Sequence, residues 1–388
     1  MEKRIYLDNN ATTQIAPEVK EAIEEAIDLF GNPSSHGKHG QIARKKVEEA
    51  RKKVAEFLNA DPEEILFTGG GSESDNTVLK DLLFKKIENP NKEISIITSP
   101  VEHPAILETC RDLEKFGIKT KYLPMYENGI VKAEDLKTMI NPETALVSVM
   151  YANNETGTIM PIKEMAKIAH ENGILFHTDA VQVAGKLKID VKDLDVDFLS
   201  LSGHKMYAPK GVGVLYIKKG HKLSRLISGG HQESGRRAGT ENTLGIIALG
   251  KAAEIAMRDI SSEEEKIRKM RDRLEKGLLD KIPYSYINGD RENRVYNTIN
   301  ISFDLIEGEA ILYLLDHLGI EVSTGSACSS GDLNPSHVLN AMKLPTERMH
   351  SSIRISFGKF NTEEEVDYVL ENFPKVISTL REMSPFSK

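Results

Sequence analysis

The sequence predicts an α/β fold, in which a mostly parallel sheet carries helices on both faces. Short apolar segments alternate with amphipathic helical patterns over residues 64–217, as expected for a chain of strand–helix–strand units. Five of these apolar segments end in clusters of polar residues. Because the carboxyl ends of parallel strands meet at one edge of a sheet, we expect those polar residues to line a single crevice.

The N-terminal part is predicted to contain a short strand and two helices. Residues 5–8 are apolar enough for a strand, and residues 9–13 follow as a turn. Apolar side chains recur at helical spacing over residues 17–30 and again over the heavily charged residues 40–58, which predicts an amphipathic helix in each.

The strands expected in the sheet are short apolar runs, each followed by polar residues. They are residues 64–68, 93–98, 145–150, 174–178 and 198–201. Residues 212–217 are expected to return beside the last of these as a hairpin strand. A glycine-bearing polar loop over residues 229–240 then precedes a helix over residues 244–257.

The C-terminal third is predicted to form a smaller α+β domain. A charged helix over residues 262–279 is expected to begin it. The further elements are a strand at 296–303, a helix at 307–318, a loop of small residues at 324–332, a strand at 352–357 and a helix at 363–380. We predict a large domain over residues 14–257 and a small domain formed by residues 1–13 and 258–388.

Composition indicates a folded, soluble protein. The 388 residues are 39% hydrophobic and 28% charged, and the formal net charge of −8 argues against nucleic-acid binding. No apolar run has the length of a membrane span, and the first residues lack the pattern of a signal peptide. We therefore expect a cytoplasmic protein without a membrane or nucleic-acid partner, without a disulfide between Cys110 and Cys328, and without a metal site.

Lys205 is the residue around which the site is predicted. It follows the apolar run 198–201 in the polar turn Ser202-Gly203-His204-Lys205. A lysine held in a crevice can lose its proton and form a Schiff base with a carbonyl group. Asp179 ends another apolar run, and a protonated pyridine nitrogen would compensate the cost of burying its carboxylate. Considered singly, the lysine could be a surface residue and the aspartate a helix cap.

An anion site is predicted where the glycine-rich residues 69–72 open a helix, because backbone N–H groups and the helix dipole attract phosphate. Further donors could come from Ser202, His204 and Thr240. His103 could stack on a planar ring, and Asn154 and Gln182 could bond its substituents. A lysine, a carboxylate, an anion cradle and a stacking ring together indicate pyridoxal phosphate.

Cys328 and Arg354 are the remaining informative residues. Cys328 lies among small polar residues, a setting that suits a reactive thiol. Cys110 lies in a predicted helix among leucines and is expected to pack. Arg354 alternates with apolar residues in a strand and could grip a carboxylate with two hydrogen bonds. A structural salt bridge is the alternative interpretation of Arg354.

Four motifs resemble those of cysteine desulfurases of the NifS/IscS type. They are Ser202-Gly203-His204-Lys205, His177-Thr178-Asp179-Ala180-Val181-Gln182, Gly235-Arg236-Arg237-Ala238-Gly239-Thr240-Glu241-Asn242 and Gly325-Ser326-Ala327-Cys328. The likeness extends from Tyr6-Leu7-Asp8-Asn9-Asn10-Ala11-Thr12-Thr13 to Arg354-Ile355-Ser356. The resemblance implies a fold-type-I pyridoxal phosphate enzyme of the class V aminotransferases, with a seven-stranded mostly parallel sheet, working as a homodimer on L-cysteine.

The resemblance also implies the roles of cofactor-binding residues. Lys205 would hold the cofactor as a Schiff base, Asp179 would pair with the pyridine nitrogen, and Gln182 would contact the phenolate oxygen. His103 would stack on the ring and take part in proton transfer. The phosphate would be bound by Gly71, Ser72, Ser202 and His204, with Thr240 reaching in from the partner subunit.

For the substrate, the resemblance implies that Asn154, which would also touch the cofactor, and Arg354 hold the carboxylate, while Cys328 takes the sulfur. The loop from Ser326 to His337 looks like the family's longer form, which favours delivery to an acceptor such as an iron–sulfur cluster scaffold. The run Gly69-Gly70-Gly71-Ser72 departs from the more usual Ser-Gly-Ala-Thr type, but its serine can still donate to phosphate.

Three other functions stay open on the sequence alone. A selenocysteine lyase or another class V aminotransferase would use the same scaffold. The third is a protein that binds pyridoxal phosphate and relays sulfur without turnover.

Overall fold

The computed structural model describes residues 4–324 and 335–384. Within them, the largest sheet has seven strands in the order β2-β8-β7-β6-β5-β3-β4. These are β2 (Ile65–Thr68), β3 (Ile94–Thr98), β4 (Ile118–Tyr122), β5 (Thr144–Ser148), β6 (Leu175–Asp179), β7 (Phe198–Ser202) and β8 (Gly213–Ile217). Strand β8 runs opposite to the other six strands of this sheet, which are parallel to one another. The predicted α/β fold with a mostly parallel sheet is confirmed.

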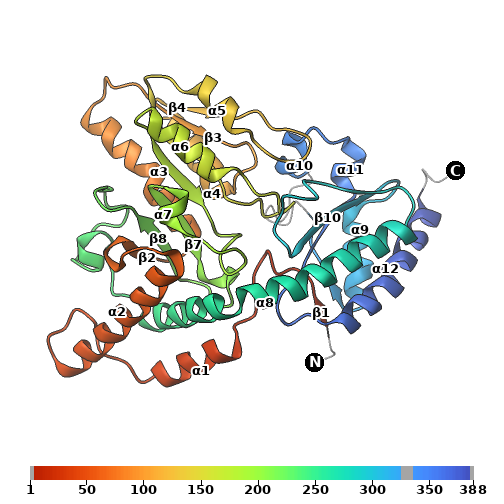
Figure 1. Ribbon diagram of the computed structural model, residues 1–388, viewed down its shortest axis with the longest axis horizontal. Coiled ribbons are helices and arrows are strands. Elements are labelled where there is room, and N and C mark those ends of the chain that lie inside the picture. Colours follow the sequence, from red (N-terminus) through yellow and green to blue (C-terminus); the bar gives the residue numbers. More distant parts are fainter. Residues whose placement is uncertain (1–3, 325–334, 385–388) are drawn as a thin grey trace.

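Helices cover both faces of this sheet (Figure 1). They are α1 (Pro17–Ala26), α2 (Lys38–Leu58), α3 (Gly71–Glu88), α4 (Pro104–Glu114), α5 (Ala133–Met139), α6 (Ile162–Glu171) and α7 (Val191–Leu194). Successive strand residues point to opposite faces, so Ile96 packs with the cluster of α3 and α4 while Ile97 joins the cluster of α2 and α6. Both faces are therefore buried, as in parallel sheets generally.

The C-terminal part is built on a second, smaller sheet. Its elements are α8 (Thr243–Lys281), β9 (Ser285–Ile287), β10 (Thr298–Phe303), α9 (Gly308–His317), β11 (Ile320–Glu321), α10 (His337–Ala341), α11 (Thr346–His350), β12 (Ser352–Ser356) and α12 (Glu363–Met383). Strands β12, β10 and β9 pair antiparallel in that order. Short 3-10 turns occur at η1 (Pro62–Glu64), η2 (Gly203–Lys205) and η3 (Glu233–Gly235).

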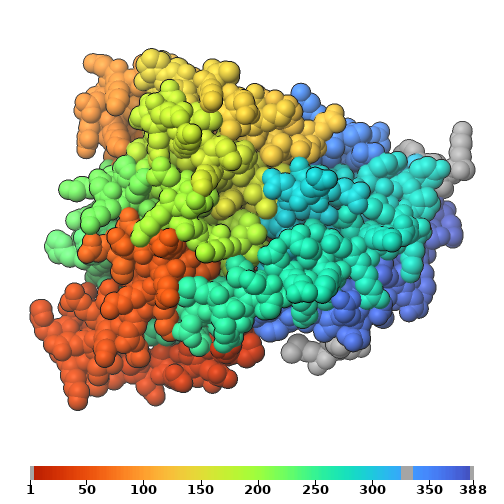
Figure 2. Space-filling view, viewed as in Figure 1, coloured from red at the N-terminus to blue at the C-terminus, as the bar shows by residue number. Residues whose placement is uncertain are grey.

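The start of the chain packs with its end. Strand β1 (Ile5–Tyr6) pairs in parallel with β11, and Ile5 and Leu7 belong to the hydrophobic cluster of the C-terminal part. That cluster lies at one end of the molecule, where the C-terminal third gathers in Figure 2. The division into domains at residues 13/14 and 257/258 stays a prediction.

The two helices predicted over residues 244–257 and 262–279 form a single helix, so that part of the prediction was wrong. Helix α8 runs for 39 residues through the expected gap between residues 257 and 262 and links the two parts of the molecule (Figure 1). The intervening residues 258–261 contain neither glycine nor proline, so no local signal ends the helix there.

Two further differences concern single elements. Helix α1 ends at Ala26, and the expected apolar face beyond it is solvent-exposed, with Ile27 at 65% and Phe30 at 78% exposure. Strand β4 was not predicted, because its sequence Ile-Lys-Thr-Lys-Tyr carries lysines, a composition typical of edge strands.

Among the described residues, no helix has the length and apolar composition needed to cross a membrane.

The packing of α2 against α8 gives a testable prediction. A Cβ added at Gly250 would lie 2.7 Å from the main-chain Cα of Ala50. Although alanine favours a helix over glycine by about 1 kcal/mol, we expect Gly250→Ala to lower the free energy of unfolding by about 1–3 kcal/mol, because the helices must separate. Urea unfolding measures this difference.

Gly277→Ala is the matched control, in the same helix. The Cβ added there meets the end of the Leu370 side chain, which can rotate away, so its cost should be smaller. A Gly250→Ala variant as stable as the parent protein would contradict the proposed helix contact.

Candidate functional site

A cavity of about 290 Å³ lies where the large sheet meets the C-terminal part. Of the predicted site residues that the structure describes, all except Thr240 line it. They are Gly71, Ser72, His103, Asn154, Asp179, Gln182, Ser202, His204, Lys205 and Arg354. The structure thus brings together groups that are separated by up to 283 residues of sequence.

The strand ends place most of these side chains. Asp179 is the last residue of β6 and Ser202 the last of β7, while His103 follows β3 and Asn154 follows β5. These four strands are parallel neighbours, so their carboxyl ends open on one edge, as predicted. Arg354 comes from β12 in the C-terminal part and closes the cavity from the other side.

Lys205 lies in the turn η2 immediately after β7. Its Nζ donates hydrogen bonds to the main-chain carbonyls of Asn10 and Ala11, each at 2.6 Å. His204 beside it is within 3.1 Å of the Thr12 hydroxyl through Nδ1. Burial and the nearby positive charge of Lys205 lower the pKa of His204 to about 4, so this imidazole is neutral at pH 7.

Buried carboxyl groups lie under the cavity. Asp179 accepts a hydrogen bond from the N–H of Val181 at 2.9 Å, and burial raises its pKa although His103 and Lys205 oppose the shift. Burial, followed by the charge of Asp179, raises the pKa of Asp75. A cation brought to Asp179 would stabilise its ionised form and relieve this cost.

His103 caps helix α4 and presents one ring nitrogen for chemistry. Its Nδ1 accepts a hydrogen bond from the N–H of Ala105 at 3.1 Å. Burial lowers its pKa, which favours the neutral ring. With Nδ1 used as an acceptor, the proton of that neutral ring is on Nε2.

The N-terminus of α3 forms the anion cradle. Gly70 has φ of +155°, and a Cβ on Gly71 would come within 2.8 Å of Val181. Both positions therefore favour glycine, and the main-chain N–H groups of the first turn stay accessible. Ser72 adds a hydroxyl at the cavity wall. A phosphate group fits these donors and the positive end of the helix dipole.

Arg354 forms an ion pair and also offers an unused donor. Its Nη2 donates to the Asp8 carboxylate at 2.6 Å, and Nη1 donates to the carbonyl of Asn154 at 3.2 Å. Among the described residues, its buried Nε has no hydrogen-bond partner. The structural salt bridge is therefore present, and a donor remains for a further acceptor.

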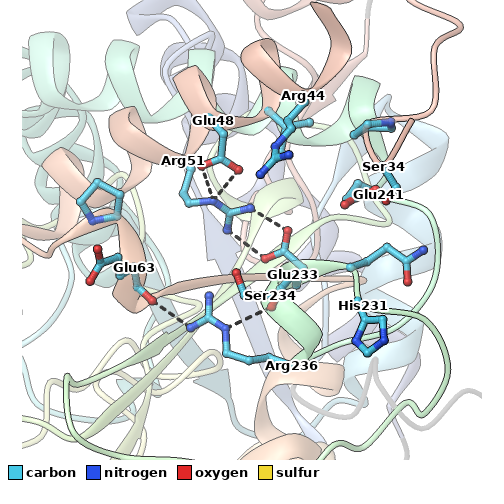
Figure 3. A pocket seen from close by; sticks show the side chains of 14 residues that line it. Ser34, Arg44, Glu48, Arg51, Glu63, His231, Glu233, Ser234, Arg236 and Glu241 are labelled. Carbon is cyan, nitrogen blue, oxygen red and sulfur yellow. Dashed lines mark hydrogen bonds and ion pairs between the residues drawn. The ribbon is translucent and has the colours of Figure 1, made fainter. Parts of the chain in front are cut away.

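Thr240 and the cysteines have different positions. Thr240 is exposed beside Glu241, which lines a separate hollow of about 660 Å³. Figure 3 shows that Arg51 in this hollow is held by Glu48 and Glu233. Cys328 lies outside the described residues. Cys110 is buried, and burial raises its pKa to about 12, which confirms it as a packing residue.

Several residues of the cavity were not predicted from the sequence. Asn10, Ala11, Asp75, Met150 and Val181 also line it. Asn10 could have been predicted from the polar pair Asn9-Asn10 directly after an apolar strand. Asp75 could have been predicted because it is a carboxylate on the sheet-facing side of α3. In the part of the chain that the structure describes, no group of three or more His, Cys, Asp or Glu is placed to hold a metal ion.

The buried Glu102 beside His103 gives a pH prediction. Its Oε1 accepts hydrogen bonds from Ser99 at 2.5 Å and from Met150 N–H at 2.9 Å, yet burial raises its pKa to about 8. A raised pKa makes folding favour the protonated form, so this stabilisation is complete below pH about 4.5 and is lost as the pH rises to about 8. Glu102→Gln cannot ionise.

We therefore expect Glu102→Gln to gain stability relative to the parent protein between pH 5 and 8, by at most about 1.4 kcal/mol per pH unit. Urea unfolding at several pH values measures the difference. Glu108→Gln, at an exposed position of α4, is the control and should show no such trend. A pH-independent difference for Glu102→Gln would refute the assignment.

Comparisons with known proteins agree with this geometry. The family described as aminotransferase class-V matches residues 5–369. Cysteine desulfurase IscS of Clostridium botulinum (strain Hall) is 51% identical over 388 residues, covering 99% of this chain and 97% of the relative. Cysteine desulfurase IscS of Methanosarcina thermophila is 50% identical over 386 residues, covering 99% and 95%.

Solved structures show the same relationship. A structure titled NifS-like protein superposes with a TM-score of 0.91 at 40% identity, covering 97% of this chain and 100% of that one. A structure titled SspA in complex with cysteine gives a TM-score of 0.82 at 34% identity, covering 93% and 100%. The chain belongs to the class V aminotransferase family, in its cysteine desulfurase branch of the NifS/IscS type.

Proposed function

We propose that this protein is a cysteine desulfurase. It would take sulfur from L-cysteine, release L-alanine, and hold the sulfur as a persulfide on Cys328 for an acceptor protein. The observation that carries the proposal is the meeting of Lys205, Asp179 and Arg354 around one cavity. The relatives that are about half identical over the whole chain bear the same activity in their names.

The cavity fits pyridoxal phosphate. Burial raises the pKa of Asp179 even though the charges of His103 and Lys205 oppose the shift, and a pyridinium nitrogen would favour its ionised form further. Gln182 Oε1 is a buried acceptor without a hydrogen bond among the described residues. The cradle at Gly71 and Ser72 suits the phosphate. When bound, the cofactor supplies an electron sink that makes the α-proton of an attached amino acid acidic. Lys205 would hold it covalently and Gln182 would face the ring oxygen.

The remaining groups bind and orient the substrate. Arg354 lies beside Asn154, and its Nε has no hydrogen-bond partner in the part of the chain that the structure describes, so we assign the substrate carboxylate to these two residues. A charge-assisted hydrogen bond in a buried site is strong. His103 would stack on the ring, and its Nε2 proton would exchange with the substrate. Lys205, as an amine, would move the α-proton.

Sulfur transfer is assigned to Cys328. Its thiolate sulfur would bond to the substrate sulfur while the substrate carbon–sulfur bond breaks, leaving the electron pair on carbon. That carbon gains a proton and becomes the methyl group of L-alanine, and the enzyme retains the second sulfur. The reaction therefore converts L-cysteine and one thiol into L-alanine and one persulfide.

The described residues on each side of Cys328 support this assignment. Ser323 exchanges main-chain hydrogen bonds with Arg354 at 3.1 and 2.6 Å. His337 Nε2 is 2.9 Å from the carbonyl of Glu102, next to His103. Cys328 is five positions after Ser323 in the sequence, and an extended chain spans at most about 18 Å over five residue steps. This short distance along the chain supports the proposal that the thiol acts on a substrate in the cavity.

We further propose a homodimer that delivers sulfur to a protein such as an iron–sulfur cluster scaffold. Thr240 is exposed and absent from the lining of its own chain's cavity. This position suits a residue that completes the phosphate site of the partner subunit. We also propose that residues 14–257 form the cofactor-binding domain, while residues 1–13 and 258–388 form the small domain.

Replacement of the thiol tests the sulfur-transfer step. We expect Cys328→Ala to lose nearly all sulfide and alanine production from L-cysteine, since no persulfide can form, while keeping the absorbance of bound pyridoxal phosphate. Cys110→Ala is the matched control at a buried packing position and should retain activity. Undiminished turnover by Cys328→Ala would defeat the assignment, and turnover only with selenocysteine would indicate a selenocysteine lyase.

Labelling identifies the lysine that carries the cofactor. After loading with pyridoxal phosphate and reduction with borohydride, mass spectrometry should find the label on the peptide of Lys205. The rival amine is Lys186, because burial lowers its pKa to about 7, but it does not line the cavity. Lys205→Ala should lose both label and visible band, whereas a label on Lys186 would show that Lys205 is the wrong lysine.

A further inference from the structure

Lys205 has a defined pair of acceptors in the N-terminal segment. Its Nζ donates to the carbonyls of Asn10 and Ala11, both at 2.6 Å. A nitrogen that donates two hydrogen bonds carries at least two hydrogens, as an amine or ammonium does and a nitrogen double-bonded to carbon does not. The two carbonyls therefore suit the lysine in the form that is not bonded to a cofactor. They stabilise its ammonium form most, since charge-assisted hydrogen bonds are the stronger ones.

The Asn10 side chain holds these carbonyls in place. Its Nδ2 donates to the hydroxyl of Thr298 at 2.9 Å, and its Oδ1 accepts from Asn297 at 3.1 Å. Its main-chain N–H donates to the hydroxyl of Ser356 at 2.9 Å. Asn10 is only 2% exposed, so each bond is shielded from water and costly to break. The segment that receives Lys205 is thereby fastened to β10 and β12.

The same residue touches the groups assigned to substrate and cofactor. Its Nδ2 also donates to the carbonyl of Asn154 at 3.2 Å, the oxygen that accepts from Arg354. Its own carbonyl accepts from Gln182 Nε2 at 3.1 Å. Asn10 therefore connects the lysine, the ring-facing amide and the carboxylate-binding pair.

We propose that Asn10 is a positioning residue that favours release of Lys205 from the cofactor when an amine substrate arrives. The inference rests on the proposed function, since it takes Lys205 as the lysine that carries the cofactor. An incoming amine that replaces Lys205 leaves a free ε-amine. That amine gains hydrogen bonds to the two carbonyls, which shifts the exchange equilibrium toward the bound substrate. Asn10 acts by holding its main-chain carbonyl in position, and it does not itself react.

The test measures the exchange without turnover. Protein loaded with pyridoxal phosphate is titrated with L-alanine and, separately, with ethylamine, and the visible absorbance reports displacement of the lysine. In Asn10→Ala we expect the half-saturating concentration of both amines to rise about tenfold, equivalent to about 1.4 kcal/mol. Ethylamine has no carboxylate, so it isolates the effect on Lys205 from any effect on Asn154 and Arg354.

Asn9→Ala is the matched control. Asn9 is also buried and donates to the carbonyls of Tyr6 and Ser356, but within residues 4–324 and 335–384 it has no hydrogen bond to a residue lining the cavity. Its half-saturating concentrations should stay within about twofold of the parent protein, a difference of about 0.4 kcal/mol. Thr298→Val removes one acceptor of the Asn10 side chain and should give a smaller rise in the same direction, which keeps the test valid if Asn10→Ala does not fold.

Three outcomes would overturn the inference. They are an unchanged ethylamine titration in Asn10→Ala, a rise with L-alanine alone, and an equal rise in Asn9→Ala. Failure of the proposed function would look different. In that case the parent protein would show no visible band with pyridoxal phosphate, or the borohydride label would lie on a lysine other than Lys205.

Discussion

The structure depends on the hydrogen bonds of a partly buried N-terminal segment, residues 8–13, which lies between the two parts of the molecule. Polar groups removed from water must be paired, and this segment is paired on both sides. Asn9 and Asn10 bond to Ser356 in β12, whereas Thr13 bonds to the carbonyl of His204 through both its N–H and its hydroxyl. The turn that carries Lys205 is thus fixed relative to the strand that carries Arg354.

This arrangement explains how distant residues share one cavity. The carboxyl ends of the parallel strands supply the side chains on one wall, and the C-terminal part supplies Arg354 on the other. Asp8 binds Arg354 across a sequence separation of 346 residues. Helix α8 joins the two hydrophobic clusters as one continuous element, so the walls are held by a helix as well as by the N-terminal segment.

Burial determines the electrostatics of the cavity. It raises the pKa values of Asp75, Asp179 and Glu102 and lowers those of His103 and His204. Desolvation therefore favours the neutral form of acids and bases alike. A cofactor with a cationic nitrogen and an anionic phosphate would supply charge where the protein provides a carboxyl group and a helix N-terminus. The proposed desulfurase chemistry uses this complementarity.

Local sequence patterns were enough to predict the fold class, most strands and the ten residues that line the cavity. These features are encoded locally, because a strand, the polar cluster at its end and a helix N-terminus each occupy a few consecutive residues. The positions of Thr240 and Cys328 in the assembled site stay predictions. The first lies away from its own chain's cavity, and the second lies outside the described residues.

The partners of these residues depend on packing between elements that are far apart in the sequence. The continuity of α8, the edge strand β4 and the acceptors of Lys205 were not evident from local patterns. Asn10 looks like an ordinary turn residue in sequence, since its partners Thr298, Asn297 and Lys205 are nearly 200 or more residues away. Periodicity reports which face of an element is buried, but packing between distant elements determines what each buried polar group contacts.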